Sequence, residues 1–222
     1  MRKILLVSVF AAFIIGGCKK KADNVSTPVT VNYPKITISG SQYVSIPVNG
    51  SFTPPSATAV DTFYNEKPTV VKNLGTLDVT TPGLYTVTYS AKNSYGFVGT
   101  ANVYVAVTDV SDTLDISLTG TYLRLANPNR VAHITKLAKG LFMTDNVGGV
   151  DITNSATGPK VSAVFAVLDL TTFTFGTQIT SDGVLSSNSE SLALAAGTSP
   201  TTINYAIQEA SFGTQVRTFV KQ

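Results

Sequence analysis

Apolar and polar residues alternate along much of the chain, and this period of two predicts β-strands. The alternation is clearest at residues 36–39 (Ile-Thr-Ile-Ser), 85–91 (Tyr-Thr-Val-Thr-Tyr-Ser-Ala) and 103–107 (Val-Tyr-Val-Ala-Val). Turn-forming residues separate these runs, among them Pro82-Gly83 and the segment from Asn93 to Gly96. Short strands with turns between them predict that residues 35–109 fold as a sandwich of antiparallel sheets.

The strand pattern continues in the second half of the chain. Further strands are predicted at residues 118–125, 131–137, 161–170, 173–179, 203–207 and 216–220. Residues 161–168 are almost continuously apolar, which predicts a central strand covered on both faces, although a buried helix can show the same pattern. Residues 191–196 are compatible with one short helical turn. We therefore predict an all-β chain with a second antiparallel β-domain at residues 116–222, either a sandwich or a barrel.

The first 17 residues have the pattern of a secretory signal peptide. Arg2 and Lys3 precede an uncharged run from Ile4 to Ile15, and small residues follow it. The run is about 12 residues long, whereas a helix that spans a membrane needs about 20. The segment is therefore predicted to be a cleaved leader and not a transmembrane anchor.

Ile15-Gly16-Gly17-Cys18 resembles the lipobox of bacterial lipoproteins. In that family the cysteine thiol is acylated, the leader is cut before the cysteine, and the new amino group is acylated as well. The resemblance implies that Cys18 carries fatty-acyl chains such as palmitate, and more than one chain is needed for stable anchoring. Residues 18–34 would then be a lipidated, flexible tether. An ordinary cleaved signal with a chance cysteine is the alternative.

Charge content limits the possible partners, and cysteine content limits the possible sources of stability. Of the 16 basic residues, 14 remain after Arg2 and Lys3 are removed, against 13 acidic residues. This balance gives no electrostatic reason to expect a nucleic-acid partner. Cys18 is the only cysteine, so no internal disulfide is available and stability must come from buried apolar area.

The first β-region resembles bacterial immunoglobulin-like repeats. The resemblance lies in residues 82–89 (Pro-Gly-Leu-Tyr-Thr-Val-Thr-Tyr) with their following hairpin, and in residues 48–52, 59–61 and 103–109. Such repeats occur in surface proteins, often Bacteroidota lipoproteins. The resemblance implies an immunoglobulin-like β-sandwich at residues 35–109 without catalytic residues, serving as a spacer or adhesive module. The cysteine pair and core tryptophan of antibody domains are absent.

A looser resemblance covers the second β-region. Residues 118–122, 134–136, 140–145 and 148–149 look like parts of the C-terminal domain of uncharacterised Bacteroidota lipoproteins, in which an immunoglobulin-like domain precedes a β-domain. Residues 110–115 are then the expected linker between the two domains.

Residues that could carry chemistry are sparse. His133 is the only histidine and lies within a predicted strand, while the three glutamates and ten aspartates show no local glycosidase pattern. Asp145, Asn146 and Asp151 around Gly148-Gly149 could offer oxygens to Ca²⁺, but their spacing differs from an EF-hand and also fits a plain turn. We predict no catalytic residues, no cofactor and no metal site, and a hydrolase is the less favoured alternative.

Four aromatic residues are candidates for ligand binding. Phe63, Tyr64, Tyr95 and Phe97 fall in predicted loops or strand ends, where the C–H face of a sugar ring could stack on them. The alternative is that they are core residues. In the expected linker, Asp112-Thr113-Leu114 matches the pattern that Bacteroidota use for O-glycosylation, which makes Thr113 a candidate modification site.

These observations predict a non-enzymatic protein anchored by lipid in the outer membrane. The immunoglobulin-like domain would be the stalk and the C-terminal β-domain the binding module, with a glycan in polysaccharide uptake, or an envelope protein, as its ligand. The alternative is a structural or adhesive surface lipoprotein that makes protein–protein contacts. Three lysines directly after Cys18 leave the surface and the periplasmic face of the membrane both open.

Overall fold

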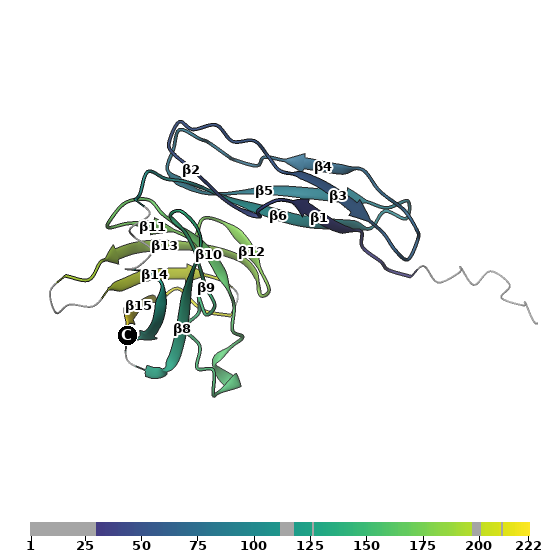
Figure 1. Cartoon of the computed structure of the whole chain (residues 1–222). Coiled ribbons are helices and arrows are strands. Elements are labelled where there is room, and N and C mark those ends of the chain that lie inside the picture. Colours follow the sequence, from purple (N-terminus) through teal and green to yellow (C-terminus); the bar gives the residue numbers. More distant parts are fainter. Residues whose placement is uncertain (1–29, 112–117, 126, 197–200, 210) are drawn as a thin grey trace, which may run out of the picture. The chain divides into compact units, whose positions relative to one another are not determined.

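The computed structural model describes residues 30–111, 118–125, 127–196, 201–209 and 211–222. The chain is nearly all β, with 53% of it in strands, which confirms the predicted fold class. Residues Asn32–Gln222 form one compact unit. This unit contains an immunoglobulin-like domain and a curled antiparallel sheet that makes a half-barrel (Figure 1).

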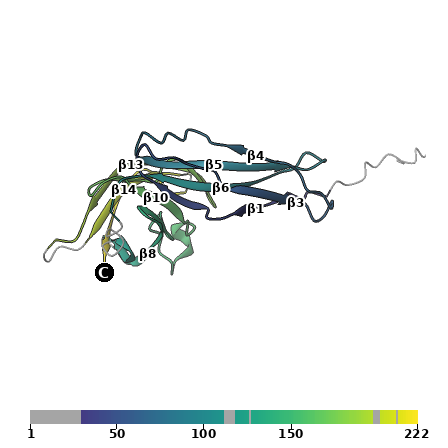
Figure 2. The same cartoon turned by 45° about the horizontal axis from the view of Figure 1, so that its top comes forward.

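Six strands build the immunoglobulin-like domain: β1 (Lys35–Ser39), β2 (Tyr43–Ile46), β3 (Ser56–Val60), β4 (Val70–Asn73), β5 (Gly83–Lys92) and β6 (Val98–Val107). β1 and β3 form one sheet, and the second sheet has the order β2-β6-β5-β4. The paired strands are antiparallel except β2, which runs parallel to β6. Figure 2 shows the two long strands β5 and β6 side by side.

The alternation in the sequence places one face of β5 and β6 in the core. Val87 and Tyr89 of β5 are fully buried, as are Val103 and Val105 of β6, and they pack against Ile36 and other apolar residues of the facing sheet. Burying such a side chain contributes about 1.5–3 kcal/mol. The period of two therefore sets both the strand and the face that it buries.

A tyrosine fixes the chain where β5 begins. The hydroxyl of Tyr85 donates a hydrogen bond of 2.9 Å to the carbonyl oxygen of Thr81, a bond back to the upstream backbone that is typical of immunoglobulin-like sandwiches. A Cβ atom at Gly83 would lie 3.1 Å from the Tyr85 ring, so the glycine allows this close approach.

The C-terminal β-domain is one curled sheet of nine strands. These are β7 (Gly120–Arg124), β8 (Asn127–Ala138), β9 (Leu141–Thr144), β10 (Ala163–Val167), β11 (Phe173–Thr174), β12 (Gln178–Thr180), β13 (Gly183–Ala193), β14 (Thr202–Gln208) and β15 (Val216–Lys221). Their order is β11-β10-β9-β8-β7-β15-β14-β13-β12, and all neighbours are antiparallel.

Aromatic rings fill the core of this sheet. Phe165 contacts Phe142, Phe173 and Phe175 at centroid distances of 5.3–5.6 Å. Tyr205 lies 4.9 Å from Phe175, and its hydroxyl donates a 2.9 Å hydrogen bond to the carbonyl oxygen of Val147. Because that polar atom has a partner, the whole tyrosine can be buried at little cost.

Several predicted elements differ in detail from the structure. Residues 191–193 continue β13, paired with β14 after a bulge at Asn188/Ser191, and not a helical turn. The expected strand 173–179 is divided into β11 and β12 around Gly176, whose φ of +57° lies in the left-handed region that glycine adopts without strain. β10 is buried at every position, as its continuous apolar sequence predicts.

The immunoglobulin-like domain and the C-terminal β-domain share a third apolar cluster. Leu84 and Ala106 of the immunoglobulin-like domain lie in one buried cluster with Leu141, Val164 and Ala166 of the C-terminal β-domain. The Thr108 hydroxyl also donates a 2.7 Å hydrogen bond to the Val167 carbonyl oxygen. These contacts explain why residues 32–222 form one unit.

Replacement of Leu185 by alanine tests the core of the C-terminal β-domain. Leu185 is fully buried, so we expect Leu185→Ala to lower the free energy of unfolding by about 2–5 kcal/mol, measured by urea denaturation. The matched control is Leu170→Ala, because Leu170 is 62% exposed and its loss should change stability by no more than about 0.5 kcal/mol. Equal losses for the two variants would contradict the described core.

Candidate functional site

The structure brings three of the four candidate aromatics together on two loops of the immunoglobulin-like domain. The rings of Tyr64 and Tyr95 stack at 4.1 Å, and Phe63 meets Tyr64 edge-on at 4.9 Å. Phe63 is 58% and Tyr95 is 56% exposed. Phe97 is partly buried and packs at 5.9 Å against Tyr33, a residue that the sequence analysis did not select. We call Phe63, Tyr64 and Tyr95 the aromatic cluster.

A buried carboxylate holds the first of these loops. Asp61 is fully buried at the end of β3, and its Oδ1 accepts hydrogen bonds of 3.1 Å from the backbone N–H groups of both Phe63 and Tyr64. Its backbone also pairs with Glu66 in both directions, at 2.9 and 3.0 Å. The carboxylate therefore fixes the backbone that carries two rings of the cluster.

A buried amide joins the second loop to the same carboxylate. Asn93 donates from its Nδ2 to Asp61 Oδ2 at 2.8 Å, while its Oδ1 accepts from the backbone N–H groups of Tyr95 and Phe97 at 3.2 and 2.9 Å. Asn32 donates to Asp61 Oδ1 at 2.5 Å and accepts from Asn93 through its carbonyl oxygen at 3.0 Å. Asp61, Asn93 and Asn32 thus tie both loops to the segment through which the chain enters the domain.

These hydrogen bonds decide the charge state of Asp61. Burial on its own would raise the pKa of Asp61, but the bonds donated by Asn93, the Tyr64 backbone, Asn32 and the Phe63 backbone outweigh it and lower the pKa below its ordinary value. Asp61 is therefore an ionised, structural carboxylate at neutral pH. Its Oδ1 accepts three of these bonds and its Oδ2 accepts the fourth, and all four donors belong to the domain itself.

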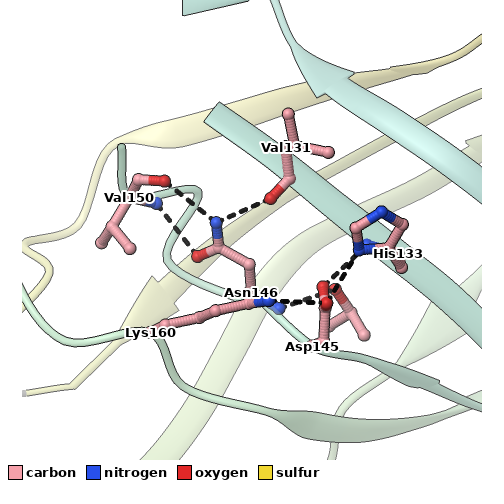
Figure 3. Close-up of polar contacts among 7 residues, drawn as sticks. Val131, His133, Asp145, Asn146, Val150 and Lys160 are labelled. Carbon is pink, nitrogen blue, oxygen red and sulfur yellow. Dashed lines mark hydrogen bonds and ion pairs between the residues drawn. The ribbon is translucent and has the colours of Figure 1, made fainter. Parts of the chain in front are cut away.

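His133 of β8 belongs to a hydrogen-bonded cluster with Asp145, which directly follows β9, and Lys160 (Figure 3). Its Nδ1 lies 2.9 Å from Asp145 Oδ2, and the same oxygen accepts a 2.7 Å bond from Lys160. The His133 backbone N–H also donates to Asp145 Oδ1 at 2.7 Å. Burial would raise the pKa of Asp145, but these bonds and the lysine charge lower it. The contacts of Asp145 thus join two strands and a loop.

The residues weighed as calcium ligands are occupied by other partners. Asn146 donates to the carbonyl oxygens of Val131 and Val150 at 2.8 and 3.0 Å and accepts from the Val150 N–H at 3.0 Å (Figure 3). Asp151 accepts from the backbone and hydroxyl of Thr153 at 2.9 and 2.6 Å. In the part of the chain that the structure describes, no group of three or more His, Cys, Asp or Glu side chains could hold a metal ion.

Two candidate sites lie outside the described residues. Cys18, with the expected leader 1–17, and Thr113, in the expected linker, are both in this category, so lipidation and O-glycosylation stay predictions. Among the residues that are described, no helix has the length and apolar content needed to cross a membrane.

The aromatic cluster could be selected from sequence, but the residues that hold it could not. Asp61 and Asn93 each stand two positions before the first aromatic residue of their segment, and this proximity is the available signal. Nothing in the spacing shows that the two loops meet, because they are joined through side chains 32 positions apart.

The lowered pKa of Asp61 predicts a specific acid sensitivity. A carboxylate with a lowered pKa in the folded state contributes stability above its unfolded pKa of about 3.9, and that contribution is lost as the pH falls further. We expect the free energy of unfolding to fall more steeply between about pH 5 and pH 3 in the wild type than in Asp61→Asn, which has no carboxylate to protonate. Urea denaturation at each pH measures this difference, and parallel curves would exclude the proposed role.

Comparisons with known proteins agree with the fold of the first domain. The family described as bacterial surface protein, Ig-like domain, matches residues 36–107. Among solved structures, the chain is similar to the crystal structure of a lipoprotein from Bacteroides thetaiotaomicron, with 22% identity over 85% of this chain and 100% of that chain. The TM-score of 0.37 is too low for this second likeness to carry an argument. No curated protein matches the chain. Residues 36–107 thus match the family of bacterial surface Ig-like domains, which indicates a protein of the bacterial cell envelope.

Proposed function

We propose that the chain is a non-enzymatic protein of the cell envelope, anchored in the outer membrane by lipid on Cys18. The match of residues 36–107 to a bacterial surface domain is the observation that carries this proposal. The lipobox-like sequence Ile15–Cys18 supports the anchor. In this arrangement the immunoglobulin-like domain is the stalk and the C-terminal β-domain is the binding module.

The contacts of the polar side chains support a binding role over catalysis. The His133–Asp145 pair is tied to Lys160 and to the backbone of β8, with no hydroxyl or thiol among its partners in the described residues. Nucleophilic catalysis needs such a group within hydrogen-bond reach of the base. Glu190 accepts hydrogen bonds of 2.5 Å from Ser187 of the same strand and 3.4 Å from Thr174 of β11.

A glycan is the ligand that the aromatic cluster supports best. Sugar rings present C–H faces that pack against aromatic faces. Phe63 and Tyr95 are more than half exposed, and the buried hydrogen bonds of Asp61 and Asn93 hold their loops in place before a ligand arrives. Such preorganisation lowers the entropic cost of binding. The immunoglobulin-like domain would then contribute contacts to a polysaccharide in addition to its role as a stalk.

A structural or adhesive role is the second candidate, supported by the open sheet edges of the same domain. Among the described strands, β3 pairs with β1 alone and β4 with β5 alone. A groove of about 450 Å³ lies between β3 and β4, lined on one side by residues 57–60 and on the other by residues 67–70. An extended segment of another protein could add to such an edge as a strand.

Metabolic labelling with palmitate tests the anchor. Because the cysteine thiol is the acyl acceptor in the proposed site, we expect wild-type protein to incorporate labelled palmitate and Cys18→Ala to show only background label. Lys19→Ala is the matched control and should label like the wild type. Absence of label from the wild type, or equal labelling of Cys18→Ala, would overturn the anchor.

Affinity electrophoresis in gels that contain polysaccharides tests the aromatic cluster. For a polysaccharide that retards the wild type, we expect Tyr95→Ala to weaken binding about tenfold, since one stacked aromatic contact is worth on the order of 1.4 kcal/mol. Val71→Ala is the control, because Val71 is exposed on β4, outside the cluster. If no polysaccharide retards the wild type and the protein self-associates instead, the adhesive alternative replaces the glycan proposal.

A further inference from the structure

All three arginines that follow the leader line a single cavity of the C-terminal β-domain. Arg124 is the last residue of β7, Arg130 lies in β8 and Arg217 in β15. The cavity has a volume of about 200 Å³. Thr157, Ser211 and Gln215 contribute further polar groups, and no lysine, aspartate or glutamate is among the described residues that line it.

Arg217 is held by neutral acceptors. It is 4% exposed, and its Nε and Nη1 donate hydrogen bonds of 2.9 Å to the carbonyl oxygens of Gly148 and Gln215. Its Nη2 donates to the carbonyl oxygen of Phe212. These bonds fix the position of the guanidinium group, but no carboxylate of the described residues pairs with it. A buried charge without a counter-charge is costly.

The other two arginines add positive charge to the same place. Arg124 donates to the carbonyl oxygen of Gly149 at 3.3 Å. Burial lowers the pKa of Arg124, and the charges of Arg217 and Arg130 lower it further. The Nε of Arg130 is buried without a hydrogen-bond partner among the described residues. Buried donors in folded proteins almost always have a partner, so this atom indicates that an acceptor belongs here.

Among the described carboxylates with a shifted pKa, Asp151 is the one affected by an arginine of the cavity, and its side chain accepts hydrogen bonds from other groups. The pKa of Asp151 is lowered mainly by hydrogen bonds from Thr153, and the charge of Arg130 makes a smaller contribution. Its Oδ1 accepts both bonds from Thr153, at 2.9 and 2.6 Å. Asp151 also does not line the cavity. None of the described residues that line the cavity therefore neutralises the positive charge of the arginines.

The glycine pair 148–149 gives the cavity its wall. Gly149 has a φ of +57°, and a Cβ atom there would lie 2.9 Å from Cδ of Arg124 and 2.7 Å from the Phe219 ring. A Cβ atom at Gly148 would overlap the Phe212 ring, at 2.3 Å. The two glycines therefore let a backbone turn approach the arginines closely enough for its carbonyl oxygens to accept their hydrogen bonds.

We propose that this cavity binds an oxyanion, namely the carboxylate, sulfate or phosphate group of an acidic ligand. Planar guanidinium groups form paired hydrogen bonds to such groups, and the bonds are strengthened by charge. The cavity volume fits one such group and not a large apolar ligand. The inference rests on the proposed role of the C-terminal β-domain as the binding module, and it assigns an acidic group to the ligand of that domain.

Thermal unfolding of the full-length, detergent-solubilised protein tests the proposal. The probes are sodium sulfate, sodium phosphate and sodium glucuronate, with sodium chloride at equal ionic strength and glucose as controls. We expect at least one oxyanion to raise Tm by roughly 3–5 °C at ten times its Kd, whereas chloride and glucose have no comparable effect. The three probes also show which oxyanion is preferred. If no oxyanion exceeds the chloride control, the proposal is overturned.

Charge-removing variants show whether the effect belongs to the cavity. Arg130→Gln should reduce the affinity for the active oxyanion at least tenfold, and Arg124→Gln removes a second lining charge if the first variant folds poorly. Lys139→Gln is the matched control, because Lys139 is exposed beyond the other end of β8, about 30 Å along the strand from Arg130. An undiminished Tm shift in both arginine variants would overturn the proposal.

Palmitate labelling of the same full-length protein separates this inference from the proposed function. A lipid-labelled protein without an oxyanion effect would overturn the cavity proposal and leave the anchor intact. An oxyanion effect in a protein without lipid label would overturn the anchor and leave the cavity proposal intact.

Discussion

Both domains depend on burying an apolar face of their sheets, because the chain has a single cysteine and cannot form an internal disulfide. In the immunoglobulin-like domain this face carries Val87, Tyr89, Val103 and Val105. In the C-terminal β-domain it carries the packed rings around Phe165. The cluster that contains Leu84 and Leu141 also buries apolar side chains where the two domains meet. The polar sites described above are built on loops and strand ends that this apolar packing holds in place.

The sequence pattern identifies strands well where one face is apolar, and less well where polar residues dominate. The alternation in β5 and β6 and the continuous apolar run of β10 predict both the strands and their burial. The sequence pattern did not predict β13, because its serine-rich sequence buries only Leu185 and Leu192. Its place is set by pairing with β14 and β12, which are neighbours that no local pattern reveals.

The sites show the same limit. Exposed aromatics at loop positions can be selected from sequence, and three of the four do meet in the structure. The arginine cavity could not be predicted, because Arg124, Arg130 and Arg217 come from three strands and only the sheet order brings them together. The one available signal is compositional: arginine is rare in this chain, and every copy after the leader is used at one place.

Asn32 and Tyr33 connect the aromatic loops to the segment that precedes the domain. If Cys18 carries the proposed lipid, 14 residue steps separate its sulfur from Asn32. A fully extended chain of that length reaches at most about 50 Å. The tether, and not the sheets, would then set the greatest height above the bilayer at which the stacked tyrosines can intercept a polymer. Lengthening or shortening residues 19–31 would change how far from the membrane the rings can reach, without altering any contact that the rings make.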